Sequence, residues 1–317
     1  MRSKMDIIWY HPSQDGKAWL EGMQRRFPQA RVRRWQPGDD APADYAIVRQ
    51  PPRELLADRP GLRGLFAMGA GVDDILAQLT RYPDMLAPSV PLMRLEDTGM
   101  ARQMQEYAVY CVLGWYRRFD DYRQLQQRTQ WQPLQPVARE AFTVGVMGAG
   151  VLGLSVINAL KPWGFPLRVW SRTPKQIDGV TSFAGREALS DFLRGTQVVI
   201  NLLPTTPETT NLFDAHTLGQ LPQGACFLNM ARGTQVVEAD LLAALDSGQL
   251  HAAALDVFQQ EPLPQENPLW CHPRVTVTPH IAALTRVDEA MDAIAQAIAD
   301  LEAGRQPSGC VDRQRGY

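Results

Sequence analysis

The stretch from Phe142 to Lys175 limits the possible folds of this chain more than any other, because two apolar runs flank a glycine-rich turn. The first run, 142–147, is rich in β-branched residues and short enough to be a buried strand. A helical apolar segment, 151–160, and a second strand, 167–170, follow. Between strand and helix the spacing is G-x-G-x-x-G, formed by Gly148, Gly150 and Gly153. This pattern predicts a βαβ unit.

Each glycine has its own physical role in such a unit. Gly148 allows the tight turn, Gly150 lets the backbone approach a pyrophosphate, and Gly153 lets the helix pack closely on the strand. The N–H groups and the positive dipole end of the helix then face the phosphates. An ordinary tight turn is the alternative, but the position between a strand and a helix favours a dinucleotide site.

The end of the second predicted strand indicates which dinucleotide binds. A site for NAD usually has an Asp or Glu there, about 20 residues past the glycines. This chain instead has a turn without carboxylates, which contains Ser171, Arg172, Thr173 and Lys175. The cations attract a 2′-phosphate and the hydroxyls can hydrogen-bond it, although a solvated basic turn is the bland alternative. We predict NADPH as the cofactor, with NADH used more weakly.

Length and composition exclude several classes of protein. A chain of 317 residues is expected to form two domains. A net charge of −2 gives no indication of a nucleic-acid or membrane surface. The four cysteines are widely separated, which argues against a zinc site or a disulfide framework and fits a reducing cytoplasm. No apolar run has the length of a membrane span or of a secretion signal. We expect a soluble, cytoplasmic protein without a metal.

The first hundred residues read as a small α/β domain with a second glycine turn. This turn, Gly69-Ala70-Gly71, carries Asp74 where the later turn carries Gly153, so it is a poor pyrophosphate site. The backbone N–H groups of Ala70 and Gly71 can hold a small carboxylate, but taken alone a plain strand–helix turn is the stronger interpretation. Residues 81–98 are proline-rich and predicted to be irregular, and one long helix is predicted from about 99 to 123.

Alternating strands and helices continue to the end of the second domain. Strands are predicted at 197–203, 225–230, 251–257 and 275–278. This alternation predicts a parallel, doubly wound sheet that binds ligands at the carboxyl ends of its strands. Three residues able to do chemistry each follow one of these strands, and they are Arg232, Glu261 and His280.

Those three residues suit the chemistry of a 2-oxo acid. An Arg binds a planar carboxylate in a forked pair and polarises the carbonyl. A His hands a proton to the carbonyl oxygen as hydride reaches the carbon. A Glu beside the imidazole orients it and favours its protonated form. Singly, a structural role is the more common explanation for each residue; together they favour catalysis.

The motifs jointly resemble the D-isomer-specific 2-hydroxyacid dehydrogenase family, and most closely its bacterial glyoxylate/hydroxypyruvate reductase A type. The resemblance spans essentially the whole chain. It is carried by Leu65–Asp73, Arg94–Val109, Gly145–Gly153, Asn201–Pro204, Asn229–Gly233, Ala253–Pro262, Thr278–Ala282 and the tail Val311–Tyr317. The acid usual for NAD is absent, which supports NADPH and a reductase.

The resemblance implies roles for individual residues. Arg232 would bind and activate the substrate, His280 would donate the proton, and Glu261 would be its partner. The amides of Ala70 and Gly71 would hold the substrate carboxylate. Besides the three glycines and the basic turn, the implied cofactor contacts are Ala149, Val151, Leu152, Leu203, Pro204, Met230 and Asp256.

The resemblance also implies the architecture and the reaction. Two Rossmann-like or flavodoxin-like domains with parallel sheets would have the active site in the cleft between them. The substrate domain would comprise 1–98 and 286–317, the dinucleotide domain 99–285, and the protein would be a homodimer. Glyoxylate would be reduced to glycolate and hydroxypyruvate to D-glycerate. The sequence does not indicate which substrate is preferred.

Two rival interpretations remain open. One is another enzyme of this family, such as a D-lactate or phosphoglycerate dehydrogenase, which an acid at position 171 or an added regulatory domain would favour; neither is seen. The other is a dinucleotide-sensing interaction protein that has kept the fold. Such a sensor has no need of Arg232, Glu261 and His280 together.

Overall fold

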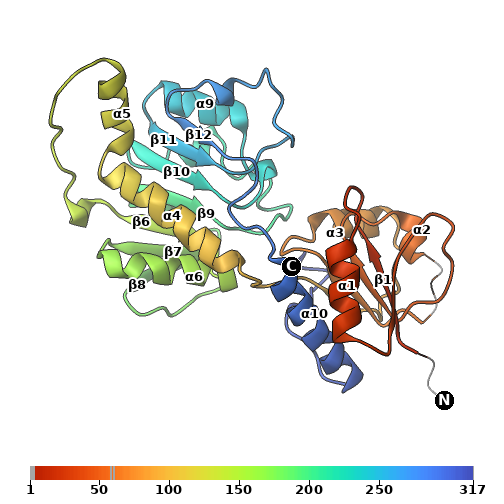
Figure 1. The fold of residues 1–317 in the computed structure, drawn as a ribbon. Helices are drawn as coiled ribbons and strands as arrows, with labels where there is room; N and C mark the ends of the chain where they lie inside the picture. Colours follow the sequence, from red (N-terminus) through yellow and green to blue (C-terminus); the bar gives the residue numbers. More distant parts are fainter. Residues whose placement is uncertain (1–3, 58, 60, 317) are drawn as a thin grey trace. The chain divides into compact units, whose positions relative to one another are not determined.

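The computed structural model describes residues 4–57, 59 and 61–316, which form two compact units (Figure 1). Unit 1 holds the chain up to Gly99 and again from Thr285, and unit 2 runs from Met100 to Leu284. These divisions differ by one residue from the predicted boundaries. Residues 1–3 and Tyr317, which the predictions placed in the first domain, lie outside the described residues. Among the described residues, no helix combines the length and apolar character needed to cross a membrane.

Unit 2 is built on a seven-stranded sheet in which every strand pairing is parallel. The strand order is β12-β11-β10-β9-β6-β7-β8, so the direction of winding reverses between β6 and β9, where such sheets bind ligands. The strands are β6 (Val144–Met147), β7 (Leu167–Ser171), β8 (Val180–Ala184), β9 (Val198–Asn201), β10 (Ala225–Asn229), β11 (Leu250–Leu255) and β12 (Val275–Val277).

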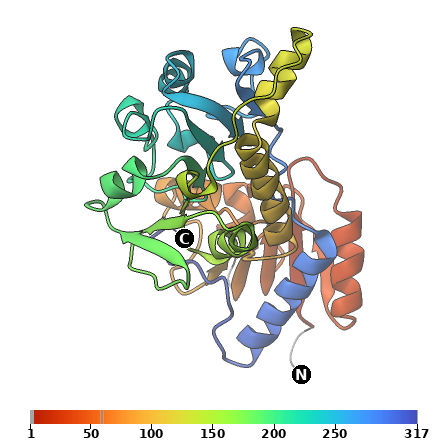
Figure 2. The same ribbon diagram turned by 90° about the vertical axis from the view of Figure 1, so that its left-hand side faces the viewer.

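Both faces of this sheet are covered by helices, which explains why its inner strands are apolar at nearly every position. On one face, Val144 and Val146 of β6 pack in a cluster with residues of α4 (Met100–Tyr116) and α6 (Val151–Leu160). These two helices lie side by side in Figures 1 and 2. The other face packs against α7 (Leu189–Arg194), α8 (Ala215–Leu218) and α9 (Glu238–Asp246).

Unit 1 contains a five-stranded parallel sheet with the order β2-β1-β3-β4-β5, a flavodoxin-like arrangement. Its strands are β1 (Asp6–Tyr10), β2 (Arg31–Arg34), β3 (Tyr45–Val48), β4 (Gly64–Ala67) and β5 (Leu92–Met93), and its helices are α1 (Lys17–Arg26), α2 (Arg53–Leu56), α3 (Asp73–Arg81) and α10 (Val287–Glu302). Helices α1 and α10 touch closely, because a Cβ on Gly22 would lie 2.3 Å from Met291. The predicted class of two α/β domains with parallel sheets is confirmed.

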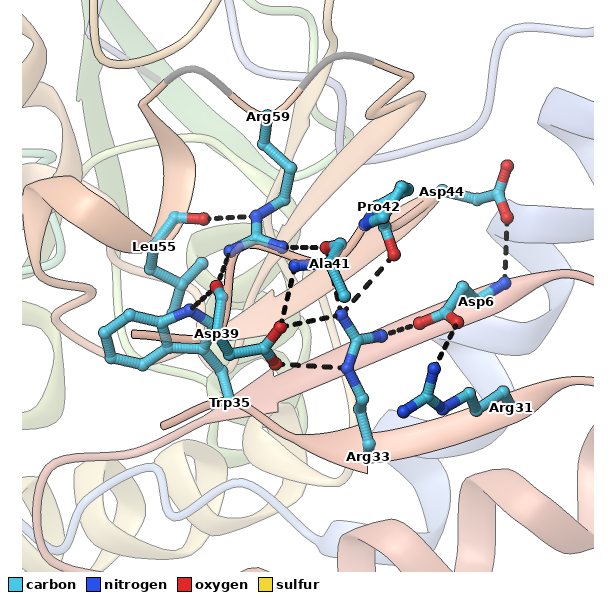
Figure 3. A network of polar contacts seen from close by, with 10 residues as sticks. All are labelled: Asp6, Arg31, Arg33, Trp35, Asp39, Ala41, Pro42, Asp44, Leu55 and Arg59. Carbon is cyan, nitrogen blue, oxygen red and sulfur yellow. Dashed lines mark hydrogen bonds and ion pairs between the residues drawn. The ribbon is translucent and has the colours of Figure 1, made fainter. Parts of the chain in front are cut away.

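Charged side chains fix the edge of the unit 1 sheet (Figure 3). Arg33 of β2 forms ion pairs with Asp6 of β1 and with Asp39. Its Nε atom lies 3.1 Å from Asp39 Oδ2. The buried Arg59 donates hydrogen bonds to the carbonyl oxygens of Leu55, Asp39 and Ala41. Because each guanidinium bridges several carbonyl or carboxylate oxygens, the irregular segment after β2 is held against the sheet.

Two local predictions were wrong, and one strand was missed. The helix predicted from about 99 to 123 is two helices, α4 and α5 (Phe119–Gln127), broken where Arg118 adopts a left-handed φ of 58°. The apolar stripe ends with α4, since all residues of α5 are described and none is buried. The short strand β5 lies in the segment predicted to be irregular, and the edge strand β8, half exposed, was not predicted. The chain also forms 3-10 turns at Arg139–Ala141, Lys161–Trp163, Gly233–Gln235 and Pro268–Trp270.

An ion pair anchors α5 to the sheet of unit 2. His251 Nε2 lies 3.0 Å from Asp120 Oδ2 and 3.6 Å from Asp121 Oδ1. The hydrogen bond to Asp120 raises the pKa of His251, partial burial opposes this, and the charges of both carboxylates add to the rise. Burial by itself raises the pKa of Asp120, but the hydrogen bond and charge of His251 outweigh this effect and leave that pKa below its usual value.

The ion pair between His251 and Asp120 is therefore expected to make the free energy of unfolding depend on pH. The contribution of His251 is fully present below its unfolded pKa of about 6.5 and is lost as pH rises through its higher folded pKa. The contribution of Asp120 is lost as pH falls through its lowered folded pKa. We expect His251→Asn to lower the free energy of unfolding by about 1 kcal/mol or less near neutral pH, and to lose this difference in alkali. Chemical denaturation at a series of pH values measures this difference in the free energy of unfolding, and His216→Asn, at an exposed histidine, is the control. A difference that does not change with pH would contradict the contribution of the ion pair to stability.

Candidate active site

The candidate catalytic residues follow three neighbouring strands of the unit 2 sheet. Arg232 comes three residues after β10, Glu261 follows β11, and His280 follows β12. Because β10 pairs with β11 and β11 with β12, all in parallel, the carboxyl ends of these strands meet at one edge of the sheet. The fold thus brings together residues that are far apart in the sequence.

His280 and Glu261 form a direct hydrogen-bonded pair. His280 Nδ1 lies 2.7 Å from Glu261 Oε2, and the other carboxylate oxygen accepts a hydrogen bond from the N–H of Phe258 at 3.0 Å. Burial raises the pKa of Glu261, but hydrogen bonds from His280 and Phe258 and the charges of His280 and Arg232 outweigh it and keep the pKa below its usual value. An ionised carboxylate on Nδ1 leaves Nε2 as the ring atom suited to proton donation.

A buried carboxylate holds the turn that carries His280. Asp256 is 1% exposed, and its two oxygens accept hydrogen bonds from the N–H groups of Ile281 and Ala282, each at 2.8 Å. Its carbonyl accepts from the N–H of His280 at 2.9 Å. These bonds keep His280 in the left-handed region, with a φ of 56°, a conformation found more often at functional sites. The predicted contact of Asp256 with a cofactor stays a prediction.

The sequence reasoning missed the next members of this network. The hydroxyl of Thr278 donates to Asp256 Oδ1 at 2.7 Å and lies 2.7 Å from the hydroxyl of Tyr107 on α4. Burial raises the pKa of Tyr107 above its ordinary value. In the sequence Tyr107 belongs to the apolar stripe of its helix, and the pattern gives no sign that its hydroxyl reaches a partner 171 residues away.

The glycine after Arg232 permits a close approach between two loops. A Cβ on Gly233 would lie 1.8 Å from the backbone carbon of Phe258, so only glycine fits there without displacing the chain. The contact places Arg232 beside the loop of Glu261. The positive charge of Arg232 lowers the pKa of Glu261. The guanidinium of Arg232 also donates to the carbonyl of Ala231 at 2.8 Å.

The turn after β6 fits a dinucleotide. Gly148 has a φ of 109°, which favours glycine, and a Cβ on Gly153 would lie 1.9 Å from the carbonyl oxygen of Gly148. Apart from Gly150 and its two chain neighbours, none of the described residues has an atom within 4 Å of the place where a Cβ on Gly150 would lie, so the backbone there is open to a ligand. Gly150 caps α6, whose first residue, Val151, is 47% exposed. A pyrophosphate fits this helix N-terminus.

The other predicted cofactor residues surround the same sheet edge. Ser171 ends β7 and is buried, with its hydroxyl donating to the carbonyl of Thr173 at 2.8 Å, so it shapes the turn that exposes Arg172 and Lys175. The remaining ones follow β6, β9 and β10, and they are Ala149, Leu152, Leu203, Pro204 and Met230. In unit 1, Ala70 and Gly71 are half-buried between β4 and α3. Each role in binding stays a prediction.

The unit that carries these residues is similar to a known family of dinucleotide-binding domains. A family model described as the NAD binding domain of D-isomer specific 2-hydroxyacid dehydrogenases matches residues 109–282. The match includes the glycine turn and all three candidate catalytic residues. The prediction of a dinucleotide-binding domain is thereby confirmed.

Solved structures resemble the chain over its whole length. A D-isomer specific 2-hydroxyacid dehydrogenase from Xanthobacter autotrophicus Py2, in complex with NADPH and MES, is 38% identical with a TM-score of 0.92, covering 99% of this chain and 100% of that chain. An NADPH-dependent glyoxylate/hydroxypyruvate reductase from Sinorhizobium meliloti, in complex with NADP and sulfate, is 33% identical with a TM-score of 0.89 and the same coverage. A family protein from Klebsiella pneumoniae 342 is 35% identical, with a TM-score of 0.86 and the same coverage.

Proposed function

Since the chain belongs to the D-isomer specific 2-hydroxyacid dehydrogenase family, we propose that it uses NADPH to reduce glyoxylate to glycolate and hydroxypyruvate to D-glycerate. The observation that carries the proposal is the His280–Glu261 pair at 2.7 Å, beside Arg232 at the carboxyl edge of a dinucleotide-binding sheet. The reductase from Sinorhizobium meliloti supports this choice of substrates.

Arg232, His280 and Glu261 have separate roles in the proposed reaction. Arg232 binds the carboxylate of the oxo acid through its planar fork and stabilises the negative charge that develops on the carbonyl oxygen. When bound, NADPH supplies the hydride for the carbonyl carbon. His280 gives that oxygen a proton from Nε2, while Glu261 fixes the orientation of the imidazole through its hydrogen bond to Nδ1. In unit 1, we assign the amides of Ala70 and Gly71 to the substrate carboxylate, and the placement of the site between the units stays part of the proposal.

The test of the reaction is an assay of NADPH consumption with glyoxylate and with hydroxypyruvate. Pyruvate is included because a D-lactate type of dehydrogenase would prefer it, and oxidation of 3-phosphoglycerate tests the phosphoglycerate type. We expect rapid turnover with the first two oxo acids. NADPH binding without turnover of any oxo acid would contradict the proposal and favour a dinucleotide-sensing protein.

The exposed turn after β7 is proposed to select NADPH over NADH. Arg172 and Lys175 are exposed cations in that turn, and the charge of Arg172 reaches Glu208, a nearby carboxylate. Replacing both cations by alanine should raise the KM for NADPH by about tenfold or more, since a hydrogen bond to a charged group contributes about 1.5 kcal/mol or more. The KM for NADH should change little, and Arg194→Ala, at the end of α7, serves as the control. Equal changes for both cofactors would contradict this assignment.

We further propose that the protein forms a homodimer and works in a reducing cytoplasm. Large aromatic side chains are exposed on α4, α5 and the connector that follows, with Tyr110 68%, Phe119 52% and Trp131 99% exposed, and such groups suit a protein interface. The four cysteines are free thiols, which fits that compartment. We expect Trp131→Asp to shift sedimentation toward the monomer, whereas Trp270→Asp, at a separate exposed tryptophan, should not. A monomeric wild-type protein would contradict the dimer.

A further inference from the structure

Three buried amide side chains connect the loop of Arg232 to the turn after β9. Asn201, Asn229 and Gln235 are each fully buried. Asn201 Nδ2 donates to Asn229 Oδ1 at 3.0 Å and to Gln235 Oε1 at 2.7 Å. Buried polar groups are costly unless they are hydrogen-bonded, and a satisfied network of this kind holds one arrangement of the chain.

Gln235 uses the whole hydrogen-bonding capacity of its amide. Its oxygen accepts from Asn201 and from the backbone N–H of Arg232, the latter at 3.2 Å. Its nitrogen donates to the carbonyl oxygens of Leu203 and Pro204, each at 3.0 Å. An amide offers two lone pairs and two N–H groups, so all four are engaged. One side chain therefore contacts both the candidate substrate-binding arginine and a candidate cofactor-binding turn.

The two asparagines also hold the two backbone segments that Gln235 contacts, at Arg232 and at Leu203. Asn229 Nδ2 donates to the carbonyl of Arg232 at 3.1 Å, so both backbone polar groups of Arg232 are bound to buried amides. Asn201 Oδ1 accepts from the N–H of Leu203 at 3.2 Å. A movement of the Leu203–Pro204 turn must therefore either break buried hydrogen bonds or carry Arg232 with it.

We propose that Gln235 is a positioning residue that holds Arg232 and the Leu203–Pro204 turn as one rigid body, so that binding of the dinucleotide and binding of the oxo acid are energetically coupled. This inference rests on the proposed function, because it takes the oxo acid as the ligand of Arg232. Coupling of this kind is reciprocal: each ligand raises the affinity for the other by the same factor.

The test is calorimetric titration of NADPH and of oxalate, a planar dicarboxylate that cannot accept hydride at a carbonyl carbon, each with and without the other. In the wild type, NADPH should raise the affinity for oxalate. Gln235→Met, which keeps the length of the side chain without its hydrogen bonds, should weaken NADPH binding roughly tenfold and bring the coupling factor close to one. The control is Gln249→Met: Gln249 precedes β11, and its amide also donates to two carbonyls, of Leu218 at 3.2 Å and Leu221 at 2.9 Å.

A merely structural role predicts a different pattern. Both methionine variants would then lose a similar amount of thermal stability and keep the wild-type coupling, which would overturn the inference, as would absence of coupling in the wild type. If Gln235→Met does not fold, Gln235→Glu keeps the acceptor for Arg232 and loses the donors to the Leu203–Pro204 turn. It should weaken NADPH binding more than oxalate binding, and equal weakening would overturn the inference. A wild type that binds both ligands with coupling but reduces no oxo acid refutes the proposed function alone.

Discussion

Replacement of His280 by alanine is expected to lower kcat for reduction of hydroxypyruvate by about 10²–10⁴-fold, the usual contribution of a positioned general acid. The proton that neutralises the developing alkoxide would then have to come from water. NADPH affinity should stay near that of the wild type, because the glycine turn lies on other strands of the sheet. Stopped-flow measurement of NADPH oxidation and calorimetric titration of NADPH separate the two quantities.

His272→Ala provides a matched control for this experiment. His272 also carries a carboxylate partner, with its Nε2 3.2 Å from Asp246 Oδ1, but it precedes β12 instead of following it. Its removal should leave kcat unchanged. Equal activity of the His280 and His272 variants would show that His280 is not the proton donor.

Replacement of Arg232 by lysine should have the second large effect. Lysine keeps the positive charge but loses the planar fork that matches a carboxylate. We expect kcat/KM for the oxo acid to fall by roughly 10- to 100-fold, since a hydrogen bond between charged groups contributes about 1.5–3 kcal/mol. The KM for the oxo acid should rise, because the lost contact already binds the ground state.

Arg274→Lys is the control for that substitution. Arg274 is exposed and lies immediately before β12, so the same exchange at this position should leave the kinetic constants unchanged. An Arg232→Lys variant with wild-type kcat/KM would contradict substrate binding by the guanidinium. A loss of activity in both variants would indicate a general effect of the exchange on the fold.

Features decided by local sequence could be predicted. β6 and α6 follow directly from an apolar run, three glycines and an apolar helical segment, and Gly148 and Gly153 have the conformations and close contacts that require glycine. The pairing of His280 with Glu261 was also predictable, because neighbouring parallel strands bring their carboxyl ends together whatever the distance in sequence.

Features decided by distant contacts could not be predicted. The network of Asp256, Thr278 and Tyr107 joins two strand ends to a helix, and no local pattern records it. Gln235 stands next to two valines in the sequence, where its burial and four hydrogen bonds leave no periodic signal. The break at Arg118 depends on a single residue with positive φ, which the continuous helical pattern concealed.

The proposed reaction is direct hydride transfer to the carbonyl carbon of a 2-oxo acid at a D-specific site. It is tested most directly by incubating the wild-type protein with hydroxypyruvate and NADPH that carries deuterium at both C4 positions of the reduced nicotinamide, and analysing the product by mass spectrometry and chiral chromatography. We expect D-glycerate that carries one deuterium on C2. L-glycerate, or glycerate without deuterium, would contradict it.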